Sequence, residues 1–274
     1  MNLWALALIV GGAAAAAVGL MYLIRNRSRV DHFFVEIERG AGVFAMIGTA
    51  FAVILAFVVL EAFGSFNDAR TGAEQEASLL VQMSRTAEFF PPEQRDAMEA
   101  DLICYGRSVI HDEWPRLQDG QRSPLVQMWV VRFQGELKQL SVQDPKQEAA
   151  FLTLLDQADQ RTDARRARLT EANRDLPAPV WFFLAVGAAM TIGFALFFAD
   201  RREHFIVQGF LIAAVTVLVV SGLLLVWFLD HPYENRSGSI KPDEMERLLP
   251  IVEHEHMDVT LPCDQNGHPP ARPA

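Results

Sequence analysis

Residues 41–60, AGVFAMIGTAFAVILAFVVL, contain no charged side chain and no proline. An α-helix rises about 1.5 Å per residue, so about 20 apolar residues cross the roughly 30 Å hydrocarbon core of a bilayer. The next stretch, residues 61–90, reads EAFGSFNDARTGAEQEASLLVQMSRTAEFF and is still helical in character but has a polar face. It is too polar to remain in lipid. One continuous helix is therefore predicted to run from a membrane bundle into an extramembrane helical domain.

Three further apolar blocks have a similar length: Leu3–Ile24, Pro179–Ala199 and Phe205–Leu229. None of them contains Asp, Glu, Lys or Arg, and hydrophobic residues make up 51% of the 274-residue chain. This pattern predicts an all-α, polytopic membrane protein with four transmembrane helices, located in the cell (inner) membrane.

The domain boundaries follow from these blocks. We expect transmembrane helices 1 and 2 in residues 1–64, an extramembrane helical bundle in 65–178, helices 3 and 4 in 179–230, and a polar C-terminal tail in 231–274. Prolines and an Asp-Gly pair divide the bundle into four amphipathic helices. The tail has one short helix candidate at 242–256, and residues 264–274, with little apolar content, are expected to be disordered.

Basic residues in the two short loops bear on orientation. These residues are Arg25, Arg27, Arg29 and Arg39 in one loop, and Arg201 and Arg202 in the other. The positive-inside rule places both loops in the cytoplasm, and hence the helical domain and the tail outside it. Arginines that flank the spans on the opposite side nearly cancel this count, so the orientation stays open: Arg70, Arg165, Arg166, Arg168 and Arg174.

Several function classes find no support in the sequence. The net charge is −10, and no long basic stripe suggests nucleic acid as a partner. His254, Glu255 and His256 are adjacent, a spacing that fits a polar tail better than a metal site. No phosphate-binding loop, nucleophile motif or cofactor fingerprint occurs, so we expect neither an enzyme nor a cofactor.

The two cysteines, Cys104 and Cys263, form neither a metal-binding nor a redox motif. Two ordinary thiols are the simpler interpretation. A disulfide between them requires that both face an oxidising compartment.

The second span presents a possible pore face. Six of its residues recur at helical spacing: Phe44, Ile47, Phe51, Ile54, Val58 and Glu61. If several subunits surround an axis, such a face forms a hydrophobic constriction with an acidic ring at its mouth. Because every face of this helix is apolar, however, any stripe would look the same. Glu61 is more simply explained as a marker of the water interface.

Several short motifs occur together in this chain. They are Asp68-Ala69-Arg70, Glu76-Ala77, Arg85, Tyr105, Glu113-Trp114-Pro115, Asp163 with Arg165-Arg166-Ala167-Arg168-Leu169, Leu176-Pro177 with Val180-Trp181, and Asp230-His231-Pro232-Tyr233 with Gly238. As a set, across about residues 30–250, they resemble a mostly bacterial, bestrophin-like family of membrane proteins whose domain has no assigned function.

The wider comparison with bestrophins implies a pentameric anion channel whose second span lines the pore. It also implies that the soluble region lies in the cytoplasm, whereas the positive-inside count above places it outside. Bestrophins hold calcium through an acidic run after the last span, and the stretch HPYENRSGSIKPDE at 231–244 lacks that run. No calcium site is therefore carried over.

The charged residues of these motifs have a structural interpretation. Six are candidates for ion pairs across the helical bundle: Glu76, Arg85, Glu113, Arg165, Arg166 and Arg168. Paired, they would fix the register of the bundle, whereas unpaired buried charges would be very costly. The alternative is that they are solvated charges on helix surfaces. Glu113 with Arg166 is the pair to test first, by charge reversal of each residue and of both.

Two functions fit this sequence. The first is an oligomeric ion channel, anion-conducting by resemblance, with the lipid bilayer, further copies of the chain and inorganic anions as partners. The alternative is a non-conducting membrane sensor or scaffold whose helical domain binds a partner.

Overall fold

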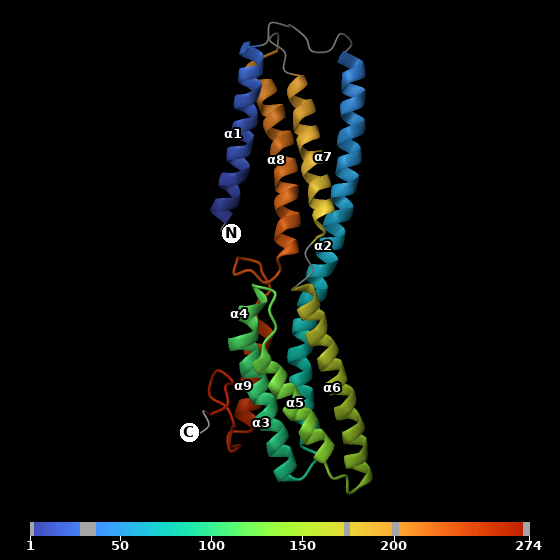
Figure 1. Ribbon diagram of the computed structural model, residues 1–274, viewed down its shortest axis with the longest axis vertical. Helices are drawn as coiled ribbons and strands as arrows, with labels where there is room; N and C mark the ends of the chain where they lie inside the picture. Colours follow the sequence, from blue (N-terminus) through green and yellow to red (C-terminus); the bar gives the residue numbers. More distant parts are fainter. Residues whose placement is uncertain (1–2, 28–36, 173–175, 199–202, 271–274) are drawn as a thin grey trace. The chain divides into compact units, whose positions relative to one another are not determined.

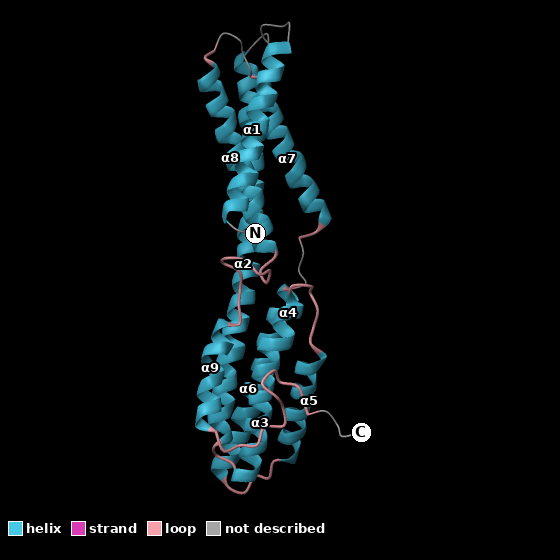
Figure 2. Cartoon of the chain, turned by 90° about the vertical axis from the view of Figure 1, so that its left-hand side faces the viewer, coloured by secondary structure: helices cyan, strands magenta, loops and turns pink. Residues whose placement is uncertain are grey.

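The computed structural model describes residues 3–27, 37–172, 176–198 and 203–270. Every secondary-structure element within these ranges is helical (Figure 2). The chain divides into two compact units. We call Met1–Ser65 with Asp175–His231 the membrane unit, and Phe66–Arg174 with Pro232–Ala274 the extramembrane bundle.

The membrane unit contains α1 (Leu3–Arg27), the first part of α2 (Ile37–Ala87), α7 (Ala178–Phe197) and α8 (Phe205–Asp230). These four described helices are long and apolar enough to cross a membrane. The predicted all-α, four-span class is confirmed, and the protein is a multi-pass membrane protein. The single helix α2 continues past the end of the membrane unit, as the run from apolar to amphipathic sequence predicts.

Small residues let the membrane helices approach closely. In Figure 1, α1, α8 and α7 lie side by side, and α8 contacts both of the others. A Cβ atom built on Gly187 of α7 would lie 2.4 Å from the Phe51 ring of α2. One built on Gly222 of α8 would lie 2.8 Å from Leu55. Helices in lipid pack through such close approaches, because lipid supplies no hydrophobic force between them.

One carboxylate holds the end of α8 to the start of α7. Asp230 accepts a 2.8 Å hydrogen bond from the Leu176 backbone nitrogen and a 3.4 Å bond from the Trp181 indole. This contact joins two of the motifs that carry the family resemblance.

Within the described residues, the extramembrane bundle contains the second part of α2 and five further helices: α3 (Pro92–Ser108), α4 (Trp114–Leu117), α5 (Pro124–Gln139), α6 (Pro145–Glu171) and α9 (Asp243–Glu255). A π-helical segment, Val109–Glu113, joins α3 to α4. The Ser123 hydroxyl caps α5 by accepting from the Val126 nitrogen, and Asp144 caps α6 by accepting from two backbone nitrogens. Proline follows each cap, where no amide hydrogen is needed.

The bundle has one contiguous apolar core. Leu80 of α2, Met98 of α3, Trp129 of α5 and Leu154 of α6 are completely or almost completely buried in it. Leu249 of the tail helix α9 also belongs to this core. Its branched side chain reaches within 2.7 Å of where a Cβ on Gly106 of α3 would lie, so this glycine lets α9 dock.

The tail is more ordered than we predicted. Cys263 is disulfide-bonded to Cys104 of α3, and the Trp129 indole donates a 2.8 Å hydrogen bond to the Gly267 carbonyl. Gly267 has φ +82°, and a Cβ there would lie 2.6 Å from the Ser108 nitrogen, so only glycine fits. The prediction of disorder is wrong for residues 264–270, because specific backbone contacts replace the missing apolar content. Residues 271–274 lie outside the described part.

The loops on which the orientation count rests are not all described. Arg29, Arg174, Arg201 and Arg202 lie outside the described residues, as does the side chain of Arg39.

Candidate functional site

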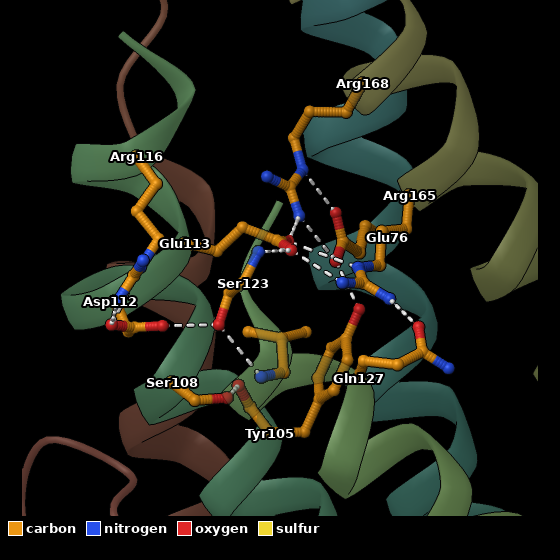
Figure 3. Close-up of polar contacts among 11 residues, drawn as sticks. Glu76, Tyr105, Ser108, Asp112, Glu113, Arg116, Ser123, Gln127, Arg165 and Arg168 are labelled. Carbon is orange, nitrogen blue, oxygen red and sulfur yellow. Dashed lines mark hydrogen bonds and ion pairs between the residues drawn. The ribbon is translucent and has the colours of Figure 1, made fainter. Parts of the chain in front are cut away.

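A buried network of charged side chains lies inside the extramembrane bundle. Glu76 of α2, Glu113 of the π-helical segment, and Arg165 and Arg168 of α6 converge there (Figure 3). Their side chains are at most 9% exposed. We call these four residues the charged cluster.

Arg168 occupies the centre of the cluster. Its Nε donates to Glu76 Oε2 at 2.6 Å, and its Nη2 donates to Glu76 Oε1 at 3.0 Å and to Glu113 Oε2 at 2.6 Å (Figure 3). Arg165 forms a two-pronged contact with Glu113, through Nη2 at 2.6 Å and Nε at 3.2 Å. Such fork-shaped arginine–carboxylate pairs are the most directional ion pairs in proteins.

Neutral groups complete the network. The Tyr105 hydroxyl donates to Glu76, and Arg165 Nη1 donates to the Gln127 side-chain oxygen at 3.1 Å. The Ser123 backbone nitrogen donates to Glu113 at 3.3 Å. The Trp114 ring lies 5.0 Å from the Arg168 guanidinium carbon and covers it from water.

The cluster keeps its charges despite its burial. Burial alone would raise the pKa of the Glu113 carboxyl, but the guanidiniums of Arg168 and Arg165 outweigh this effect and lower that pKa. Burial likewise works to lower the pKa of Arg168, and the carboxylates of Glu76 and Glu113 more than reverse it. Burial and the neighbouring Glu76 both raise the pKa of Tyr105, which therefore stays neutral.

Local backbone geometry brings Glu113 into the cluster. The π-helical segment adds a wider turn after α3, and Glu113 at its end is completely buried. π-Helical turns are uncommon and often occur where a side chain must be redirected. Nothing in the spacing of VIHDE predicts this turn.

Two of the six predicted ion-pair residues lie elsewhere. Arg166 is 68% exposed and pairs at 2.9 Å with Asp163 on the same surface of α6. Arg85 is exposed on α2. Arg166 points away because it is one residue beyond Arg165 on the helix, which is about 100° around the axis. The structure therefore joins Glu113 to Arg165 and Arg168, and not to Arg166.

The contacts of the cluster are those of a structural ion-pair network and not of a catalytic site. Each of its carboxylates is held by arginine, so neither is left as a general base or nucleophile. The cluster joins α2, the segment after α3 and α6, which are far apart in sequence. The arrangement fixes how these helices align.

Most of the predicted pore face on α2 is covered by other helices of the same chain. Phe51 is 6% exposed and packs on Gly187. Phe44, Ile47, Ile54 and Val58 are half-buried, and the Phe44 ring lies 5.7 Å from that of Phe198. Glu61 is exposed. The predicted stripe mostly faces the neighbouring helices of the same chain, because 3–4 spacing cannot distinguish the faces of a wholly apolar helix.

A wide face of α2 is uncovered within one chain. One row along it, which we call the exposed stripe, consists of Met46, Ala50, Val53, Phe57, Glu61 and Gly64. Met46 is 76% exposed and Phe57 is 68% exposed. The exposed stripe lies about a quarter of a turn from the predicted one and shares only Glu61 with it.

Two tail residues, Glu255 and His256, lie close to Glu88, which is far from them in sequence. Ligand atoms of Glu88, Glu255 and His256 lie within 4.8 Å of one another, and both carboxylates are exposed. His256 Nε2 also lies 3.3 Å from the buried Glu99. Such a group could accept a divalent cation, although solvated acids gather in this way without one. His254 does not take part in it.

Sequence reasoning assigned no role to Tyr105 and Trp114, which contact the cluster, or to Arg161, which packs on Tyr105. Tyr105 and Trp114 occur in the family motifs, so that resemblance was a usable signal. Arg161 of α6, whose guanidinium carbon lies 4.6 Å from the centroid of the Tyr105 ring, gave no signal.

Comparisons with known proteins agree on one family. A model of the bestrophin-like domain matches residues 8–244. No curated protein matches the chain. A crystal structure of a variant of a bacterial bestrophin homologue from Klebsiella pneumoniae is 13% identical, with a TM-score of 0.67, and the match covers 92% of this chain and 97% of that one.

A second solved structure, described only as a membrane protein, is 15% identical with a TM-score of 0.66. That match covers 96% of this chain and 98% of the other. At such low identity these structures establish the fold, and the domain match establishes the family. The chain therefore belongs to the bestrophin-like family.

Proposed function

We propose that this protein is an oligomeric ion channel of the bestrophin type that conducts anions, with α2 lining the pore. The family supports this proposal, since bestrophins are anion channels. The observation that carries it is the exposed stripe of α2, a row of mainly apolar side chains that the chain itself leaves uncovered.

The chemistry of the exposed stripe suits a gate. Several copies of Phe57 around an axis would form a ring of aromatic side chains, and a narrow apolar ring blocks ions by excluding water. Small residues on either side, Ala50 and Gly64, would leave wider sections. We therefore propose that the constriction lies at Phe57 and not at Phe51.

Glu61 on the same stripe opposes anion selectivity. A ring of carboxylates attracts cations and repels anions. An anion channel that carries this ring is expected to be only partly selective. Replacing Glu61 by Gln removes the negative ring and should raise the ratio of anion to cation permeability.

The test is conductance of the purified protein in a planar bilayer with a salt gradient. Phe57→Ala should increase conductance several-fold, and Glu61→Gln should shift the reversal potential towards that of chloride. Phe63→Ala is the matched control, because Phe63 is 56% exposed on the same helix but lies off the stripe. Phe51→Ala tests the stripe first predicted from spacing and should leave selectivity unchanged.

The alternative, a non-conducting sensor or scaffold, predicts a different result. No current would then appear in wild type or in Phe57→Ala, and the chain would remain a stable monomer in detergent. That combination would exclude the channel proposal.

We infer that the extramembrane bundle lies outside the cytoplasm. Cys104 and Cys263 are 159 residues apart and form a disulfide, which persists in oxidising compartments and is rare in the cytosol. Arg25 and Arg27 at the end of α1 agree with a cytoplasmic position for that end. Alkaline phosphatase fused to the C-terminus should be active, and green fluorescent protein at the same point should be dark. The reverse result would place the bundle in the cytoplasm.

A further inference from the structure

A buried arginine in the extramembrane bundle lacks an acidic partner. The side chain of Arg161 is only 2% exposed, and its Nε has no hydrogen-bond partner. Its guanidinium lies over the Tyr105 ring, with the carbon 4.6 Å from the ring centroid. Within the described part of the chain, no carboxylate lies at ion-pairing distance from it. A buried charge without a partner is costly.

The charges around Arg161 do not balance. Arg161, Arg165 and Arg168 are cations, and the carboxylates of Glu76 and Glu113 are both used by the other two arginines. Tyr105 adds no negative charge, because burial raises its pKa. Three buried positive charges therefore face two negative ones. Among these five groups, the positive charges exceed the negative ones by one.

The side chain of Arg161 opens onto a cavity. This cavity lies between α5 and α6 and has a volume of about 330 Å³. We call it the Arg161 pocket. Its polar lining includes Arg122, Arg161, Arg165, Arg166, Gln127 and Gln134. Its lining includes no acidic side chain among the described residues.

The lining is chemically suited to an oxyanion. Guanidinium groups present several N–H donors in a plane, which matches the oxygens of phosphate and carboxylate groups. The side-chain oxygen of Gln127 accepts from Arg165, which leaves its amide group free to donate into the cavity. Donors thus outnumber acceptors in the lining, as an anion site requires.

We propose that the Arg161 pocket binds a small oxyanion, a phosphate or a carboxylate, whose charge balances Arg161. This site is separate from the membrane helices. It does not depend on whether the protein conducts, and conductance is not used to test it.

The test titrates anions onto the purified full-length protein in detergent at constant ionic strength, by calorimetry and by melting temperature. Sodium phosphate, sulfate and acetate replace sodium chloride in separate experiments, so that phosphate-type and carboxylate ligands are distinguished. Saturable binding of one oxyanion per chain, with a rise in melting temperature, is the expected result. If phosphate and chloride changed the melting temperature equally, the effect would be general ionic screening, and the proposal would be overturned.

Two exposed arginines at the rim give a variant that should fold normally. Arg122→Gln with Arg166→Gln should weaken oxyanion binding at least tenfold and leave the melting temperature without anion unchanged. Arg85→Gln with Arg247→Gln is the matched control, since it removes the same charge from exposed positions outside the Arg161 pocket. Equal loss of binding in both double variants would overturn the site.

Arg161 itself gives the sharpest result. Arg161→Met should abolish oxyanion binding while leaving the melting temperature in anion-free buffer unchanged or higher, because an uncompensated charge is removed. A large fall in melting temperature would mean that Arg161 is already neutralised, and the proposal would fail. A change of oligomeric state with no anion response would instead identify a carboxylate of another copy as its partner, which also excludes an oxyanion.

Discussion

The membrane unit and the extramembrane bundle differ in where they place large apolar side chains and charges. In the membrane unit, large apolar residues such as Trp4, Met46 and Ile206 are more than three-quarters exposed, and the helices meet through small residues. In the bundle, apolar residues are collected in one core, and that core encloses four paired charges. The difference follows from the solvent. Lipid does not penalise apolar exposure, whereas water does and so drives the formation of a core.

This comparison separates what each unit depends on. The stability of the bundle should fall when a buried charge loses its partner, when the disulfide is broken, or when a buried carboxyl loses its proton. The membrane unit should be insensitive to such changes and sensitive to single methyl groups at helix contacts.

The largest effect is expected in the charged cluster. Arg168→Gln leaves Glu76 and Glu113 buried without their main partner and should cost about 3–5 kcal/mol in the free energy of unfolding. Arg166→Gln, two residues along the same helix, removes an exposed pair and should cost less than about 1 kcal/mol. Urea unfolding in detergent, followed by circular dichroism, measures both. Equal costs would show that the cluster does not stabilise the bundle.

The disulfide should rank second. Joining Cys104 to Cys263 closes a very long loop, and native disulfides of this kind contribute about 2–4 kcal/mol. Cys104→Ser with Cys263→Ser should lower the melting temperature and expose the tail to protease. Dithiothreitol should have the same effect on wild type and none on the double variant. If dithiothreitol did not lower the melting temperature of the wild-type protein, this prediction would be contradicted.

The third effect depends on pH. Burial raises the pKa of Glu99 to about 7, with Glu88 and Glu255 contributing, while the Ser84 hydrogen bond and Arg95 oppose the shift. His256 also lies beside this carboxyl. Because the folded protein holds the proton more tightly than the unfolded chain, this stability is complete below about pH 4.5. It is lost as the pH rises through about 7.

Glu99→Gln should remove much of that loss. At pH 8 the variant should be more stable than wild type by on the order of 2 kcal/mol, and the two should converge near pH 5. A smaller slope should remain, because burial also raises the pKa of Asp101 to about 7. Glu93→Gln, an exposed neighbour on α3, should keep the wild-type profile. Melting temperatures from pH 5 to pH 8 provide the measurement, and identical profiles for both variants would contradict it.

The sequence predicted the elements better than it predicted their faces. Span length and proline positions predict the helices, because both act locally along the chain. Phe51 shows the limit: a wholly apolar helix has no pattern that tells a lipid face from a contact face. Only the position of Gly187 on another helix shows that Phe51 points inward.

The site shows a related limit. The motifs indicated Glu76, Glu113, Arg165 and Arg168, but they could not show that a π-helical turn brings Glu113 to Arg168. They also could not show that Arg166 lies on the exposed side of α6. The pairing of Cys104 with Cys263 was equally hidden, since it depends on the tail packing on α3. Long-range contacts of this kind have no signature in spacing.

The smallest effect is expected in the membrane unit, at the contact between α2 and α7. A Cβ added to Gly187 would lie 2.4 Å from the Phe51 ring, so Gly187→Ala requires the helices to separate or the ring to move. Overpacking of this kind typically costs about 1–3 kcal/mol, and a yielding lipid environment favours the lower value. Gly193→Ala, on the same helix with no atom within 4 Å of its added Cβ, is the matched control and should be neutral or slightly stabilising.

Thermal stability in detergent, read by size-exclusion chromatography after heating, distinguishes the two glycine variants. Combining Gly187→Ala with Phe51→Ala should recover part of the loss, because the smaller side chain makes room for the added methyl group. The charged-cluster and pH effects should remain unchanged in these variants, since they arise in the bundle. If Gly187→Ala instead flattened the pH profile, the two units would share one unfolding transition, and the contrast between them would reflect composition and not separate sources of stability.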